Sequence, residues 1–107
     1  MTSGIYSYTN NTEFVNRINR NPTLNFNTSE VIDMINNKPA VDSPGTRFDY
    51  SDTNYVLLGY IIEEVSGTSV EKYITEEILS KLNLFNTYLP MDGEMSIRPE
   101  YMDGYTN

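Results

Sequence analysis

Residues 53–65 place the strongest constraint on the fold, because their apolar side chains are distributed around nearly the whole helical circumference. The apolar residues of this stretch are Tyr55, Val56, Leu57, Leu58, Tyr60, Ile61 and Ile62. A surface helix shows one apolar stripe, whereas a helix that is apolar on most sides is covered by neighbouring elements. We therefore predict a buried core helix over residues 53–65, ended by Ser66-Gly67.

Three other stretches carry the start signals of helices. Residues 10–13, 27–30 and 68–71 each begin with a polar capping residue that is followed three residues later by Glu, and apolar residues at helical spacing come next. Asn21-Pro22 ends the first of these helices, and Asn36-Asn37 ends the second. The apolar residues expected to face inward are Phe14, Val15 and Ile18, then Val31, Ile32 and Ile35, then Val70, Tyr73, Ile74, Ile78 and Leu82.

A turn separates the second of these helices from the core helix. Ser43-Pro44-Gly45 is typical of a type II turn, in which the residue after the proline needs a positive φ. Beyond Pro90 no apolar period is sustained and two Asp-Gly dipeptides occur, which favours a loop. We therefore predict a mainly α fold in which residues 1–107 form a single helical subdomain. Its ordered core spans about residues 12–88, and residues 91–107 form a loop-like tail.

Composition excludes several classes of function. The formal net charge is −8, and seven Lys and Arg against fifteen Asp and Glu leave no basic stripe for nucleic acid. The sequence contains neither Cys nor His, which excludes disulfides, thiolate or imidazole metal ligands, and Ser-His-Asp or Cys-His catalysis within the chain. It has no apolar run long enough to cross a membrane and no signal-peptide pattern at its start.

Three stretches resemble one known family and occur in the family's order. They are Thr2-Ser3-Gly4-Ile5, then PGTRFDYSDTNYVLLGYIIEEVSG, then Leu82-Asn83-Leu84 with Asn86-Thr87. The chain is similar to the serine β-lactamase and penicillin-binding-protein group, in the branch of class C β-lactamases, D-alanyl-D-alanine carboxypeptidases and related esterases. Its members carry His-Thr-Ser-Gly, then Pro-Gly-x-x-Phe-x-Tyr-Ser-Asn before a Leu-Leu-Gly helix, then Pro-Leu-Gly-Met. The resemblance extends to about residue 88.

The chain departs from the family pattern in three places. Met1 stands where the family has His, Asp52 where it has the Asn of Tyr-x-Asn, and residues 81–84 where it has Pro-Leu-Gly-Met. The family's Ser-x-x-Lys nucleophile motif lies well upstream of the tyrosine, and its Lys-Thr-Gly or His-x-Gly strand lies well downstream. The resemblance therefore implies the helical subdomain of an α/β serine hydrolase, whose remaining α/β domain supplies the nucleophile, a Lys and the oxyanion hole.

The resemblance also implies roles for three consecutive residues. Tyr50 matches the family tyrosine that transfers protons between nucleophile and leaving group, while Ser51 and Asp52 lie at the substrate. A phenol with an ordinary pKa of about 10 acts near neutral pH only when nearby cations favour its anion or a Lys shares the proton. Ser51 or Asp52 could equally cap the core helix, and both alternatives stay open.

One Ser-x-x-Lys pattern lies within the chain, at Ser69 and Lys72. It follows Tyr50 in the sequence, whereas the family's nucleophile precedes the tyrosine. We interpret it as the start of a helix, with Lys72 on the solvated face.

The sequence thus predicts a fragment of a serine hydrolase, inactive alone, which transfers acyl groups from a D-Ala-D-Ala peptide, a β-lactam or an ester. No cofactor is expected. The expected partners are the remaining α/β domain and a small-molecule or peptidoglycan-peptide substrate, and the family implies a secreted or cell-surface location. One alternative is a non-catalytic cell-wall or peptide-binding homologue, which Asp52 favours. Another is an independent acidic interaction module.

Overall fold

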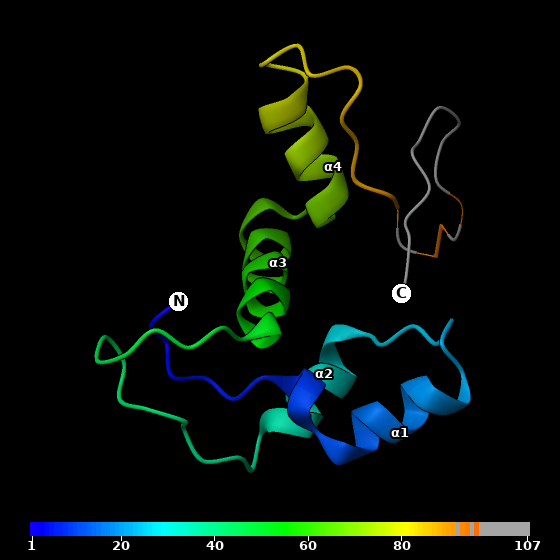
Figure 1. Ribbon diagram of the computed structural model, residues 1–107. Coiled ribbons are helices and arrows are strands. Elements are labelled where there is room, and N and C mark those ends of the chain that lie inside the picture. Colours follow the sequence, from blue (N-terminus) through cyan, green and yellow to red (C-terminus); the bar gives the residue numbers. More distant parts are fainter. Residues whose placement is uncertain (92, 95, 97–107) are drawn as a thin grey trace, which may run out of the picture. The chain divides into compact units, whose positions relative to one another are not determined.

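The computed structural model describes residues 1–91, 93, 94 and 96, and every regular element among them is helical, as predicted (Figure 1). The chain divides into two compact units, Met1–Val70 and a second that begins at Glu71. Within the predicted tail, residues 91–107, positions 92, 95 and 97–107 lie outside the described residues. The elements are the 3-10 turn η1 (Tyr8–Asn10), α1 (Thr12–Arg20), α2 (Thr28–Ile35), α3 (Asp52–Ser66), α4 (Val70–Ile74) and the π-helix η2 (Thr75–Leu79).

Helix α2 begins at the predicted capping residue, and α1 is capped one residue later than predicted. The side chain of Asn11 accepts a hydrogen bond from the Glu13 backbone N–H at the start of α1. At the start of α2, Asn27 and Glu30 form a capping box in which each side chain bonds the other's backbone N–H. The start signals act within three or four residues, so the sequence alone places both helix starts to within one residue.

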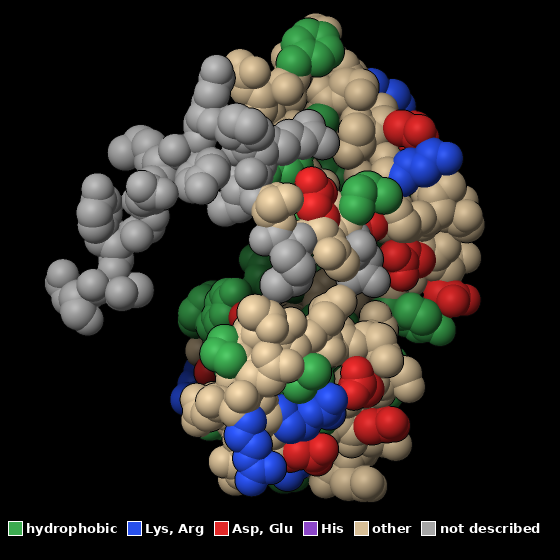
Figure 2. Space-filling model, turned by 90° about the vertical axis from the view of Figure 1, so that its right-hand side faces the viewer, with side chains coloured by type: hydrophobic (Ala, Val, Ile, Leu, Met, Phe, Trp, Pro, Cys, Tyr) green, Lys and Arg blue, Asp and Glu red, His purple; other side chains and the backbone are tan. Residues whose placement is uncertain are grey.

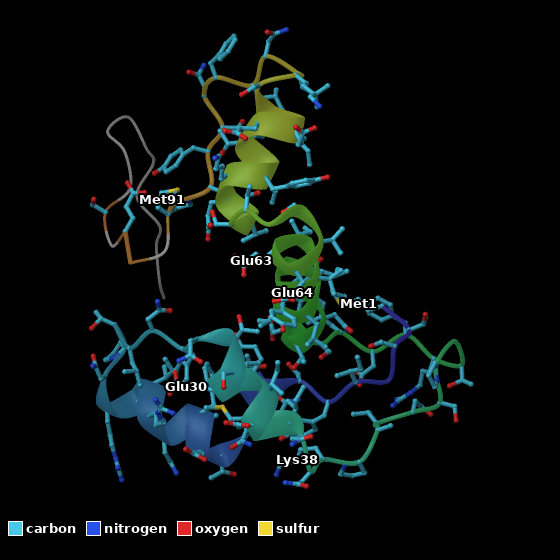
Figure 3. All side chains as sticks on the ribbon, turned by 180° about the vertical axis from the view of Figure 1, so that it is seen from behind. Met1, Glu30, Lys38, Glu63, Glu64 and Met91 are labelled. Carbon is cyan, nitrogen blue, oxygen red and sulfur yellow. The ribbon has the colours of Figure 1, made fainter. Side chains whose placement is uncertain are left out.

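A small aromatic and ionic cluster joins α1 to the segment before α2. Phe14 lies between Tyr8, whose ring is perpendicular at 5.0 Å, and Phe26, whose ring centroid is 4.9 Å away. Arg17 stacks over the Phe26 ring at 4.4 Å and donates to Glu30 at 2.8 Å. Glu30 belongs to the first turn of α2 and is labelled in Figure 3. The guanidinium thus binds an aromatic face and a carboxylate at once.

Helix α3 has the predicted span, but the prediction that it is buried is wrong. Tyr55 is 59% exposed and Val65 is 83% exposed, and the one residue of α3 that is fully buried is Thr53. Covering a helix that is apolar on most sides needs packing layers on most sides, and α3 packs against α2 and η1. Hydrophobic side chains of α3 therefore remain at the surface. Figure 2 shows hydrophobic side chains exposed on the face of the molecule that it draws.

The N-terminal segment runs antiparallel to the loop that leads into α3. The backbone N–H groups of Val41, Gly45 and Asp49 donate to the carbonyls of Gly4, Thr2 and Met1, at 2.8, 2.7 and 2.9 Å. Figure 3 labels Met1 beside this loop. The predicted turn is confirmed, because Gly45 has φ +82° and the Thr46 N–H donates to the Ser43 carbonyl at 3.2 Å.

Gly4 is required where the two segments meet. It has φ +70°, and a Cβ built on it would lie 2.0 Å from the Asp42 carbonyl oxygen. Any other residue would push the N-terminal segment away from the loop that precedes Tyr50.

The predicted fourth helix is interrupted. It starts as α4 and continues as the π-helix η2, where the Ser80 N–H donates to the Thr75 carbonyl five residues earlier at 2.9 Å. A π-turn holds more residues than an α-turn and rotates the side chains that follow it. Ile78 and Leu82 are accordingly 45% and 63% exposed, so their predicted inward orientation is wrong.

Candidate functional site

Tyr50 lies between two segments that are fixed by hydrogen bonds. On one side, the preceding residue Asp49 is bonded to the N-terminal segment through its backbone N–H, and on the other, α3 begins at Asp52. Tyr50 is 54% exposed, and its ring centroid is 6.2 Å from the ring centroid of Tyr55. The backbone around Tyr50 is therefore held while the phenol stays accessible.

The start of α3 is joined to residues 6–9 by side-chain hydrogen bonds between segments more than 40 residues apart. The Thr53 hydroxyl donates to the Tyr6 carbonyl at 2.8 Å and accepts from the Tyr8 N–H at 3.0 Å. Ser7 Oγ accepts from the Asp52 N–H at 3.1 Å. These bonds attach the segment that contains η1 to the first turn of α3, so they fix the residues that follow Tyr50.

The Asp52 carboxylate faces two hydroxyl groups of that segment. Its Oδ2 accepts from Thr9 Oγ1 at 2.9 Å and from Ser7 Oγ at 3.3 Å. Asp52 is the first residue of α3, where the helix dipole favours a negative charge. Sequence reasoning missed Ser7 and Thr9, because two hydroxyl residues in a short segment carry no periodic signal.

Ser51 holds the N-cap position of α3 without making the capping hydrogen bond. Its side chain is 1% exposed, and its Oγ has no hydrogen-bond partner within the described part of the chain. Ser7 takes over part of the capping role instead, because it accepts from the Asp52 N–H.

Two tyrosines beside Asp52 have raised pKa values. The pKa of Tyr50 is raised by desolvation, then by the charge of Asp52 and by that carboxylate as a hydrogen-bond acceptor, with smaller effects from Tyr55 and Tyr8. The pKa of Tyr8 is raised by burial and then by Asp52. Every group that shifts Tyr50 is neutral or anionic. The phenol is therefore protonated near neutral pH, and a cation from elsewhere would be needed to make it a base.

Other polar features of the molecule involve different residues. A hollow of about 260 Å³ beside Arg17 is lined by Glu13, Glu30, Asp33 and Met34, and Arg17 bonds Glu30 within it. Ser69 directly precedes α4, and the Lys72 ammonium lies 4.0 Å from a carboxylate oxygen of Glu76. Within the described residues, no group of acidic side chains is arranged to hold a metal ion. The helices of the described chain are all too short or too polar to span a membrane.

Comparison with known proteins gives consistent results. The family model described as Beta-lactamase matches residues 1–107. A protein of Escherichia coli K12 named D-alanyl-D-alanine carboxypeptidase is 38% identical over 58 residues, which are 54% of this chain and 13% of that protein. A protein of the same name from Salmonella paratyphi B is 34% identical over 59 residues, 55% of this chain and 14% of the relative.

One solved structure is similar in fold as well as in sequence. It is a D-stereospecific amidohydrolase from Streptomyces sp., with a TM-score of 0.70 and 30% sequence identity. The similarity covers 78% of this chain and 26% of that one. The chain thus spans a small part of the length of each of these three relatives.

Proposed function

Because the chain belongs to the β-lactamase family of serine hydrolases, we propose that it is the helical subdomain of such a hydrolase and supplies Tyr50 as a proton-transfer residue. The observation that carries this proposal is the placement of Tyr50. By resemblance it corresponds to the tyrosine of the family motif, and it lies two residues before the start of α3, with hydrogen-bonded segments on both sides and its phenol exposed.

The chemistry of this role follows from the properties of a hydroxyl nucleophile. A neutral serine is a weak nucleophile and needs a base, and this chain contains no His. In the proposed mechanism, Tyr50 takes the serine proton and passes it to the leaving group, while a Lys of the α/β domain favours the phenolate. Since the groups around Tyr50 raise its pKa, this Lys is essential to the proposal.

We propose Ser51 and Asp52 as residues at the edge of the substrate site, because they adjoin Tyr50. The substrate would be a D-Ala-D-Ala peptide, a β-lactam or an ester. The relatives' names favour amides, since two carry the name D-alanyl-D-alanine carboxypeptidase and one the name D-stereospecific amidohydrolase. A peptidoglycan peptide fits this class, and we place the complete enzyme at the cell surface or outside the cell.

The exposed apolar face of α3 supports the subdomain proposal. Leu58 and Ile61 are 54% and 53% exposed, which is unusual for side chains of this kind on one helix. We propose that the remaining α/β domain covers them. The nucleophile and the oxyanion hole would come from that domain.

A non-catalytic homologue of the same fold is the second candidate, and Asp52 is the observation that favours it. A carboxylate accepts hydrogen bonds but donates none, so it cannot replace an Asn amide that donates to a substrate carbonyl. Its charge also disfavours the Tyr50 phenolate.

Substitution of Tyr50 separates the two candidates. In the complete hydrolase that contains this chain, Tyr50→Phe should lower kcat/KM for a D-alanyl amide about 100-fold or more, because a positioned acid–base group contributes that much. Tyr60→Phe removes a hydroxyl from a similarly exposed tyrosine of α3 and should leave the rate unchanged. A complete protein that binds the peptide but hydrolyses none of it would support the non-catalytic candidate.

A further inference from the structure

The two hydroxyls that face Asp52 also contact each other. Ser7 Oγ and Thr9 Oγ1 are 2.9 Å apart, Thr9 Oγ1 is 2.9 Å from Asp52 Oδ2, and Ser7 Oγ is 3.3 Å from the same oxygen. Each hydroxyl has one proton to donate, so two protons serve three contacts. The shorter distances favour a chain in which Ser7 donates to Thr9 and Thr9 donates to Asp52, and the longer contact to Asp52 is the alternative use of the Ser7 proton. Ser7 then keeps a lone pair for the Asp52 N–H, from which it accepts at 3.1 Å.

Asp52 also affects the pKa of a third hydroxyl group, the Tyr50 phenol. Its carboxylate acts on the Tyr50 phenol both as a charge and as a hydrogen-bond acceptor. The hydroxyls of η1 and the phenol therefore compete for one carboxylate. Whatever holds Asp52 on the η1 side leaves less of its acceptor capacity for Tyr50.

We propose that Thr9, supported by Ser7, is a positioning residue that holds the Asp52 carboxylate against η1 and limits its contact with the Tyr50 phenol. This makes an acid tolerable beside the tyrosine, in the place where the family has an amide. The importance of this arrangement for catalysis rests on the proposed function, whereas the arrangement itself can be tested without any substrate.

Three groups raise the pKa of the Tyr50 phenol through their charge or hydrogen bonding. They are Asp52 at the start of α3, Tyr55 one turn further along, and Tyr8 of η1. A substitution at Thr9 leaves the chemical identity of all three unchanged and, of the three, removes a hydrogen bond only from Asp52. A change in the titration of Tyr50 would therefore report a change in how Asp52 is held.

The experiment places a fluorinated tyrosine at position 50 of this chain and follows its titration by fluorine NMR. Fluorination lowers the pH at which the phenol ionises, and a single label separates Tyr50 from the other tyrosines. In Thr9→Val the carboxylate loses its closest donor and becomes free to accept from Tyr50, so the pKa of the phenol should rise by about one unit. Thr9→Ser keeps the donor and should restore the original value.

Controls distinguish positioning from a general loss of structure. Thr12→Val makes the same change at an exposed threonine of α1 and should leave the titration of Tyr50 unaltered. The double variant Ser7→Ala/Thr9→Val removes both donors and should raise the pKa of Tyr50 at least as far as Thr9→Val does. Circular dichroism checks that each variant keeps its helix content, and if the double variant loses it, the single variant decides.

A Tyr50 titration that is the same in the original chain, Thr9→Val and the double variant, with helix content intact, would overturn the proposal. So would an equal rise in Thr9→Val and Thr9→Ser, since the hydroxyl would then be irrelevant. Either result leaves the proposed function standing, because the loss of activity in Tyr50→Phe is measured separately.

Discussion

At the scale of single residues, the region around Tyr50 contains both satisfied and unsatisfied polar groups. Asp52 and Thr53 each make two or more hydrogen bonds to residues 6–9, whereas the buried hydroxyl of Ser51 makes none within the described residues. A buried polar atom without a partner costs free energy, because it has given up its bonds to water. This cost agrees with our proposal that Ser51 lies at the edge of the substrate site.

Replacing Ser51 by alanine should therefore stabilise the chain. The substitution removes an unpaired buried hydroxyl and changes the side-chain volume little, so we expect the free energy of unfolding to rise by about 1 kcal/mol. Urea unfolding followed by circular dichroism measures this change. Ser7→Ala is the matched control and should destabilise the chain, because Ser7 accepts from the Asp52 N–H. A loss of stability in Ser51→Ala would mean that a bound water or another group satisfies the hydroxyl.

At the scale of elements, the helices hold together through short-range caps and a few long-range polar pairs. The start of α2 shows both, since Glu30 bonds the Asn27 N–H within its own capping box and accepts from Arg17 of α1 at 2.8 Å. These bonds lower the pKa of Glu30, with the Arg17 hydrogen bond as the largest cause. The carboxylate therefore stabilises the contact between α1 and α2 only while it is ionised.

This pKa shift predicts an acid-sensitive step in stability. Since the pKa is lower in the folded chain than its ordinary value of 4.5, the contribution of Glu30 is present above that pH and is lost as the pH falls through the folded value. Thermal unfolding at a series of pH values between about 3 and 7 should show this loss. In Glu30→Gln the decrease in unfolding temperature at acid pH should be smaller than in the original chain. Glu64→Gln, at an acid of α3, should keep the pH dependence of the original chain.

At the scale of the whole molecule, the chain is a member of a hydrolase family. It covers only part of the length of its relatives. Its buried hydrophobic side chains within the described residues are Val31 and Met34, a small core for this many residues. Most large apolar side chains of α3 are exposed instead. We attribute this imbalance to the remaining domain, which would bury them in the complete protein.

The imbalance gives a test of the subdomain proposal. Ile61→Ser replaces a side chain that is 53% exposed, so in this chain alone it should change the free energy of unfolding by about 0.5 kcal/mol or less. In the complete hydrolase the same position would be buried, and the loss should reach about 2 kcal/mol or more. Val15→Ser on α1 is the control, because it makes the same kind of apolar-to-polar change at another exposed position, which is 42% exposed. Equal small effects of Ile61→Ser in both proteins would contradict docking at α3.

The sequence by itself determined the features that depend on neighbouring residues. The starts of α1 and α2, the end of α3 at Gly67 and the turn at Gly45 follow from caps and backbone preferences that act over a few positions. The family motif was also readable, because Tyr50 and its flanks are contiguous. Their assigned roles remain predictions.

Only the tertiary structure decided how those elements are covered and joined. An apolar pattern shows that α3 can be buried but not that a covering layer is present, so the predicted burial of Tyr55 and Val65 failed. The π-turn of η2 changed the faces of Ile78 and Leu82 without a signal in the apolar spacing. The bonds from Ser7 and Thr9 to Asp52 join residues 45 and 43 positions apart, and no local pattern encodes a contact between such distant hydroxyl and carboxylate groups.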